Sequence, residues 1–253
     1  MEELFFEVTL AVIPCIAIAL GVYLWDQHRP EPFWLVAISF LLGGLAFGLN
    51  LLIGWYPNHF YQGGEETIFQ KAVHVFLVIA IPEELCKFIM VLLLMRFTRS
   101  NFTEPIDGIV YTVMVGMGFA CVENLIYVLE HGAGSGILRM FSAIPAHAML
   151  GIIMGFHLGI ARFTRRKWKQ FLALGLIIPV GMHGMYNLFL YLHFIQGMWI
   201  GAGIGMLISL YFCLQSIKIH QRFSPYNPHN PRYRHLHNKE NPSLEGIDTK
   251  NTL

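Results

Sequence analysis

The sequence has few charged residues. Of its 253 residues only 13% are Asp, Glu, Lys or Arg, while 55% are hydrophobic and the net charge is +1. An ordinary soluble domain has about 25% charged residues. A soluble chain of this length could not cover so much apolar side-chain surface with polar groups. The shortage of charge therefore argues against a soluble globular domain and favours a membrane protein.

Several familiar catalytic motifs are also missing. There is no His-Glu-x-x-His, the helical zinc site of many metalloproteases, and no Gly-x-Ser-x-Gly, because the nearest stretch, Gly134-Ser135-Gly136, has the wrong spacing. The four cysteines stand in apolar stretches without a Cys-x-x-Cys pair, which is typical of small buried side chains. Asp107 lacks a second intramembrane aspartate, so an aspartyl dyad is also unsupported.

Long apolar runs dominate what is present. Seven stretches reach the roughly 20 residues that a membrane-spanning helix needs. Their expected bounds are Leu4–Trp25, Phe33–Tyr56, Ala72–Met95, Pro105–Leu129, Leu138–Ala161, Gln170–His193 and Met198–Ile217. The sequence thus predicts an all-α, polytopic transmembrane helix bundle of about seven spans in residues 1–217. Residues 218–253 lack apolar periodicity, and we expect a disordered cytoplasmic tail.

The basic residues predict the orientation of these spans. If the N-terminus lies outside, all but three of the 17 Lys and Arg residues fall in cytoplasmic segments, including the five between residues 162 and 169. The exceptions are Lys71, Lys87 and Arg139, of which Lys71 and Arg139 stand at outer helix ends. Because positive residues stay on the cytoplasmic side, we expect an N-out, C-in arrangement.

The third span contains charges where lipid would be expected. It reads Ile-Pro-Glu-Glu-Leu-Cys-Lys, with Glu83, Glu84 and Lys87 within about one helical turn. Each charge at the bilayer centre costs about 2.5–3.5 kcal/mol on insertion scales, so such residues are functional candidates. Lys87 can pair with either acid, at i+4 or i+3. One acid is then surplus, which indicates a function beyond an ion pair.

Three later spans carry polar groups at a similar depth. Glu123 follows the glycine-rich run of the fourth span, His147 stands in the fifth, and His183 and Asn187 share one face of the sixth. At 1.5 Å per residue, Glu83, Glu123, His147 and His183 lie roughly 9–17 Å from the outer helix ends. Prolines precede three of these motifs, and helix breaks inside a membrane are tolerated beside a watery cavity. The pattern predicts one site in the outer half of the membrane.

These groups suffice for hydrolysis of an amide. A carboxylate can serve as general base, a neutral His can share in activating water, and an Asn amide can donate to an oxyanion. Glu83, Glu123, His147 and His183 could also ligate zinc together. Metal-free and zinc-dependent chemistry both stay open at this stage.

The ordered set of motifs resembles the PrsW family, which is related to the CAAX prenyl proteases. The match consists of Glu83-Glu84-x-x-Lys87, Phe119-x-x-x-Glu123-Asn124, His147 and His183-x-x-x-Asn187, and covers roughly residues 70–190. The CAAX branch typically has His at the position of Glu123, which favours PrsW.

The resemblance implies a multi-pass protease of the bacterial cytoplasmic membrane. It would cut a single-span membrane protein, such as an anti-sigma factor, near its extracytoplasmic side. By position, Glu83 would activate water, with Glu84 and Lys87 as electrostatic partners. Glu123 and His147 would assist, while His183 and Asn187 would stabilise the oxyanion.

Two other functions fit parts of the pattern. Intramembrane Glu and His residues also form proton relays in transporters, although the inner halves of these spans have few acids. A non-catalytic membrane receptor would keep the fold without needing the Glu and His side chains. No nucleic-acid partner is indicated.

Overall fold

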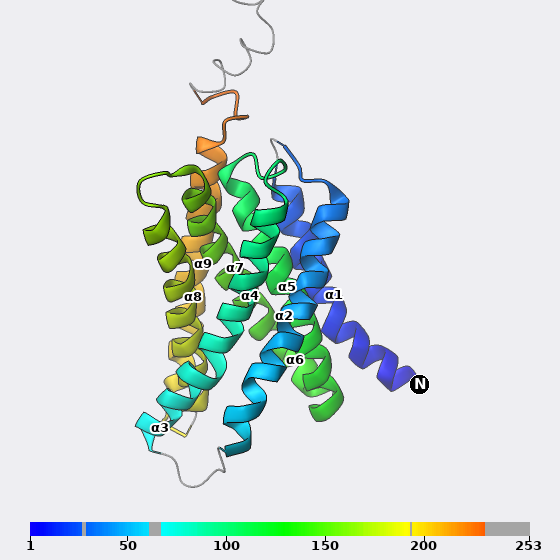
Figure 1. The fold of residues 1–253 in the computed structure, drawn as a ribbon. Coiled ribbons are helices and arrows are strands. Elements are labelled where there is room, and N and C mark those ends of the chain that lie inside the picture. The colour runs from blue at the N-terminus through cyan, green and yellow to red at the C-terminus, as the bar shows by residue number, and fades with distance from the viewer. Residues whose placement is uncertain (27–28, 61–66, 193, 231–253) are drawn as a thin grey trace, which may run out of the picture.

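The computed structural model describes residues 1–26, 29–60, 67–192 and 194–230. Every regular element in these ranges is a helix, as Figure 1 shows. The elements are α1 (Glu2–Trp25), α2 (Phe33–Phe60), α3 (Ile68–Val73), the π-helix η1 (His74–Ala80), α4 (Ile81–Phe97), α5 (Pro105–His131), α6 (Ala133–Phe141), α7 (Ala143–Phe163), α8 (Trp168–Tyr191) and α9 (Met198–Phe223). The predicted all-α fold is confirmed.

Six helical segments of the described chain are long and apolar enough to cross a membrane. They are α1, α2, α5, the α6–α7 segment, α8 and α9. The outward side chains of these helices are apolar; Leu41 and Leu207, for example, are 71% and 69% exposed. A lipid environment accounts for such exposure, because it removes the cost of apolar contact with water. The chain is a multi-pass membrane protein.

The third predicted span is formed by three consecutive helices, α3, η1 and α4. They form one continuous helical path from Ile68 to Phe97 (Figure 1). The π-helical segment ends at Ala80, two residues before Pro82, which stands in the first turn of α4. Proline lacks an N–H and its ring collides with the carbonyl four residues earlier. A locally widened helix relieves this clash, so the predicted break at Pro82 takes the form of a π segment.

The other two prolines behave differently. Pro145 occupies the first turn of α7, where a missing N–H costs little. Pro179 lies inside α8, which continues through it. Of the three prolines that precede the polar motifs, Pro179 is thus the one that stands inside a helix and not in its first turn.

Two predicted span bounds differ from the observed helices. The span predicted to begin at Leu138 is divided at Ser142, so that α7 begins at Ala143 and Leu138 belongs to the separate α6. The last predicted span ends at Ile217, whereas α9 continues to Phe223. Residue 193, the predicted end of the sixth span, and residues 231–253 of the predicted tail lie outside the described residues.

Helix α5 is the centre of the bundle and packs against α1, α2 and α7. Glycines allow the closest approaches. A Cβ atom at Gly118 of α5 would overlap the Phe40 carbonyl of α2, and one at Gly108 would lie 2.6 Å from the Gly155 carbonyl of α7. Small residues let backbones approach in this way in membrane bundles. Gly118, in the glycine-rich run of α5, therefore lets the backbone of α2 approach closely.

Candidate active site

The first turns of α4 place three charged side chains in the protein interior. Glu83, Glu84 and Lys87 are all buried. The Lys87 ammonium lies 2.7 Å from Glu84 Oε1 and 3.7 Å from Glu83 Oε2. The predicted i+3 and i+4 pairs are both present, and Glu84 is the closer partner.

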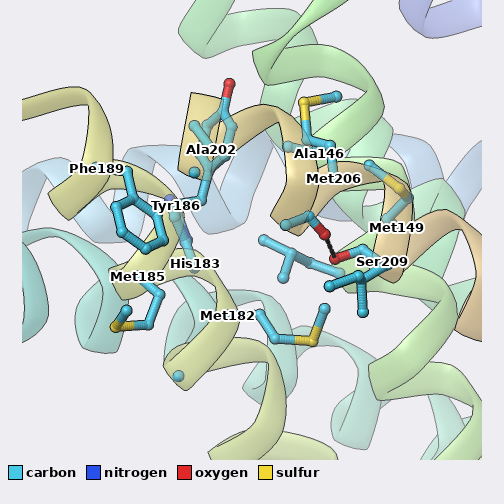
Figure 2. A pocket seen from close by; sticks show the side chains of 15 residues that line it. Ala146, Met149, Met182, His183, Met185, Tyr186, Phe189, Ala202, Met206 and Ser209 are labelled. Carbon is cyan, nitrogen blue, oxygen red and sulfur yellow. Dashed lines mark hydrogen bonds between the residues drawn. The ribbon is translucent and has the colours of Figure 1, made fainter. Parts of the chain in front are cut away.

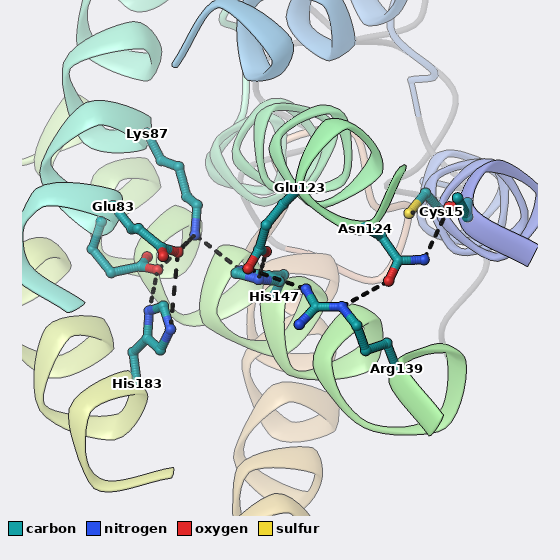
Figure 3. A network of polar contacts seen from close by, with 10 residues as sticks. Cys15, Glu83, Lys87, Glu123, Asn124, Arg139, His147 and His183 are labelled. Atoms are coloured by element: carbon teal, nitrogen blue, oxygen red, sulfur yellow. Dashed lines mark hydrogen bonds and ion pairs between the residues drawn. The ribbon is translucent and has the colours of Figure 1, made fainter. Parts of the chain in front are cut away.

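His147 of α7 connects this group to α5. Its Nδ1 lies 3.0 Å from Lys87 Nζ, and its Nε2 lies 2.9 Å from Glu123 Oε2. Since an ammonium only donates, Nδ1 accepts, and Nε2–H donates to the carboxylate. His147 therefore joins a cation of α4 to an anion of α5 (Figure 3).

His183 of α8 lies on the other side of the two α4 carboxylates. Its Nδ1 donates to Glu84 Oε1 at 2.9 Å, which turns Nε2 toward Glu83 Oε2 at 4.0 Å. The rings of His147 and His183 meet edge to face, with centroids 5.5 Å apart. Four helices thus contribute to one polar cluster, as the depth argument predicted.

Sequence reasoning missed Arg139 as part of this cluster. Arg139 of α6 lies 3.1 Å from Glu123 Oε1 and donates from Nε to Asn124 Oδ1 at 2.8 Å. Its guanidinium also stacks over the Tyr127 ring, 3.9 Å from the centroid. The signal in the sequence was weak. Arg139 is a single basic residue on the predicted outer side, where few basic residues are expected, and its two partners, Glu123 and Asn124, stand on the preceding span.

Asn187 is the predicted residue that stands apart. It lines the same cavity as the other candidates, one turn from His183. Among the described contacts, none joins Asn187 to the other six predicted residues. Asn187 therefore lines the cavity without taking part in the contacts that hold the cluster together.

A cavity of about 540 Å³ borders the cluster. The predicted site residues that line it are Glu83, Glu123, His147, His183 and Asn187, and Arg139 and Glu130 also contribute to its wall. A second cavity of about 280 Å³ lies between α7, α8 and α9, and its lining is almost entirely apolar. Figure 2 shows His183 and Tyr186 at its wall, and both residues also line the first cavity.

The charges of the cluster do not balance. Its carboxylates are Glu83, Glu84 and Glu123, and its cations are Lys87 and Arg139. With neutral histidines, one negative charge is uncompensated among these described residues. Glu83 Oε2 is buried and has no hydrogen-bond partner in the described structure, so the surplus carboxylate that the sequence predicted is best assigned to Glu83.

The donor atoms fit a zinc ion. One ligand atom from each of Glu83, Glu123 and His147 lies within 4.8 Å of the others, and the same holds for Glu83, Glu84 and His183. Mixed nitrogen and oxygen sets of this kind are typical of zinc. Glu84 on the Nδ1 side of His183 is the carboxylate–histidine pairing found behind many metal ligands.

Comparison with known proteins identifies the family of this chain. The family described as "PrsW family intramembrane metalloprotease" matches residues 31–215. Protease PrsW of Geobacillus kaustophilus is 33% identical over 187 residues, covering 73% of this chain and 79% of that protein. Protease PrsW of Bacillus subtilis is 33% identical over 188 residues, covering 74% and 84%.

No solved structure matches this chain. The family match extends over more than half of the chain, and each of these relatives is about one third identical over most of its length. This chain belongs to the PrsW family of intramembrane proteases, and it is a peptidase.

Proposed function

We propose that the protein hydrolyses a peptide bond of a membrane-protein substrate with a water molecule that Glu83 activates. The observation that carries this proposal is the state of Glu83 Oε2. It is buried, lacks a hydrogen-bond donor among the described residues, and belongs to a side chain that lines the cavity. A carboxylate with an unused lone pair beside a cavity is suited to accept a proton from water.

The bond changes follow from that position. Oxygen of the water attacks the peptide carbonyl carbon while its proton passes to Glu83. The carbonyl oxygen becomes an oxyanion, and the proton on Glu83 then moves to the amide nitrogen as the C–N bond breaks. The Asn187 amide is a donor that we assign to oxyanion stabilisation, and the imidazolium form of His183 would add a second donor at Nε2, which lies 4.0 Å from Glu83 Oε2.

Glu84, Lys87, Glu123 and His147 act as positioning groups in this scheme. Glu84 orients His183 through the 2.9 Å bond to Nδ1. Lys87 favours the ionised form of Glu83, and its bond to His147 links it to Glu123. Such fixed charges contribute most where water is excluded.

A bound zinc ion would fit the same residues. Glu83, Glu123, His147 and His183 would hold it, and it would supply Lewis acidity and a more acidic bound water. Glu84 would then orient the zinc ligand His183, and Arg139 would orient the zinc ligand Glu123.

The substrate that we propose is a single-span membrane protein of the anti-sigma-factor type, cut near its extracytoplasmic side. The apolar cavity between α7, α8 and α9 supports an apolar segment as the bound group, because His183 and Tyr186 line both cavities. We place the protein in a bacterial cytoplasmic membrane, with its N-terminus outside and its C-terminus inside.

Co-expression with a panel of tagged single-span membrane proteins, anti-sigma factors included, tests this function. We expect one or more of them to be cut by the wild type and left intact by Glu83→Gln and by His183→Ala. Purified pairs are then assayed with and without a zinc chelator, which separates metal-dependent from metal-free hydrolysis. Equal cleavage by the wild type and both variants would reject the site.

A further inference from the structure

A second cluster of buried carboxyl groups lies at the other end of α5. Its members are Asp26, Glu31, Glu104 and Asp107, each at most 4% exposed. Asp107 and Glu123 are 16 residues apart on one helix, which is about 24 Å at 1.5 Å per residue. The cluster is therefore separate from the catalytic cavity and has no part in the proposed hydrolysis.

Three chain segments bring these groups together. Asp26 ends α1, Glu31 precedes α2, and Glu104 caps α5 one turn before Asp107. One carboxylate oxygen from each of Asp26, Glu104 and Asp107 lies within 4.8 Å of the others. Glu31 lies beside Asp107 and accepts a hydrogen bond from the buried Tyr111 hydroxyl.

Asp107 is held in position by its backbone. Its Oδ2 accepts from the Thr103 N–H at 2.6 Å and the Glu104 N–H at 2.9 Å. Its Oδ1 is buried and has no hydrogen-bond donor in the described structure. One oxygen therefore fixes the side chain, and the other faces the cluster.

Glu104 is the observation that points to a ligand. It is 0% exposed, and neither carboxylate oxygen makes a full hydrogen bond among the described residues, although the Asp107 N–H of the helix cap and the Ser224 hydroxyl lie nearby. Burial raises the pKa of both Glu31 and Glu104, because the charged forms have lost their water. A buried carboxyl group in this setting either takes up a proton or pairs with a cation.

Beside Glu31 and Glu104, the cation among the described residues is Arg29, which lowers the pKa of both in part. However, the Arg29 side chain is exposed, bonds to the Tyr226 hydroxyl, and lies over that ring at 4.9 Å. Glu31, Glu104 and Asp107 therefore lie together with one exposed cation near them, and either protons or a bound cation must neutralise them.

We propose that Asp26, Glu104 and Asp107, assisted by Glu31, bind a divalent cation of the Mg²⁺ or Ca²⁺ class. The ligand atoms are all oxygens, which these hard cations prefer. Metal–oxygen distances of about 2.1–2.5 Å allow two ligand oxygens to lie up to about 5 Å apart, and the three oxygens of this cluster all lie within 4.8 Å of one another. The ion would join the end of α1 to the start of α5.

Terbium luminescence tests the proposal on the purified full-length protein. Tb³⁺ is a hard trivalent cation that Tyr111 and Trp25, both next to the cluster, can sensitise. We expect a saturable signal from about one ion per chain that excess Mg²⁺ or Ca²⁺ displaces. In Glu104→Gln we expect the affinity for Tb³⁺ to fall about tenfold or more, because one charged ligand is lost.

Glu83→Gln is the matched control, since it removes one acid from the catalytic cluster and should keep the Tb³⁺ signal. Size-exclusion chromatography checks that Glu104→Gln folds, and Asp26→Asn replaces it if it does not. An unchanged signal in the cluster variants, or its loss in Glu83→Gln alone, would overturn the proposal. Absence of a signal in the wild type would also overturn it, and would indicate that the carboxyl groups share protons instead.

Discussion

Lys87 contacts both halves of the polar cluster that we propose as the active site. Its ammonium lies 2.7 Å from Glu84, 3.0 Å from His147 and 4.1 Å from the centroid of the Phe119 ring. Removing one member of a buried ion pair leaves an uncompensated charge, which typically costs 3–5 kcal/mol. The Glu84–Lys87–His147 contacts therefore fix the geometry around Glu83 as well as its charge.

Arg139 provides a test at the residue scale, because it contacts Glu123 and was not among the residues predicted from the sequence. We predict that Arg139→Gln lowers kcat about tenfold or more, since a charge-assisted hydrogen bond contributes roughly 1.5–3 kcal/mol. The measurement is the initial rate of substrate cleavage in liposomes. Arg162→Gln, at the opposite end of the bundle, is the control, and equal rates for both variants would contradict the role of Arg139.

The sequence predicted all seven candidate residues as one site because intramembrane charge is costly wherever it occurs, and six of the seven contact one another. Arg139 escaped this reasoning, since a basic residue at an apparent helix end needs no special explanation. The sequence also did not single out Asp26, Glu31 and Glu104, because carboxylates at the ends of membrane spans ordinarily face water. Only the packing of α1 against α5 shows that these three are buried.

At the scale of single elements, α5 depends on close backbone contact with α2 and α7. The glycines at these contacts leave no room for a methyl group, as the Gly118–Phe40 overlap shows. The apolar runs predicted that these helices exist, but not where they are interrupted. Ser142 divides one predicted span into α6 and α7 and lets Arg139 reach Glu123.

We predict that Gly118→Ala destabilises the protein by about 1–3 kcal/mol, because the added methyl forces α2 away from α5. Thermal unfolding in detergent measures the change. Gly203→Ala is the matched control, since a Cβ there meets nothing within 4 Å. The control should be neutral or stabilise by up to about 1 kcal/mol, as alanine favours a helix over glycine. A Gly118→Ala protein as stable as the control would contradict the packing account.

At the scale of the whole molecule, the basic segments gather at one end of the bundle. Arg96, Arg99 and the residues around Arg165 lie where α4 and α7 end, and α9 leads to residues 224–230 at that same end (Figure 1). The acidic cluster lies at this end as well, while α6 and Arg139 lie at the other. The positive-inside rule assigns the basic end to the cytoplasm.

Reporter fusions test this orientation. We predict that a reporter active only outside the cytoplasm is inactive when fused at the C-terminus and active when inserted between residues 132 and 136. A reporter active only in the cytoplasm should give the opposite pattern. Activity of the outside reporter at the C-terminus would reverse the orientation and move the proposed cleavage to the cytoplasmic side.

The most direct test of the account is the cleavage rate of purified Glu83→Gln in liposomes. Glu130→Gln makes the same chemical change at the wall of the same cavity, outside the catalytic cluster. Loss of general-base catalysis lowers a rate about 10²–10⁴-fold. The account predicts a loss of that size for Glu83→Gln and nearly wild-type activity for Glu130→Gln. A folded Glu83→Gln protein that cleaves as fast as Glu130→Gln would contradict it.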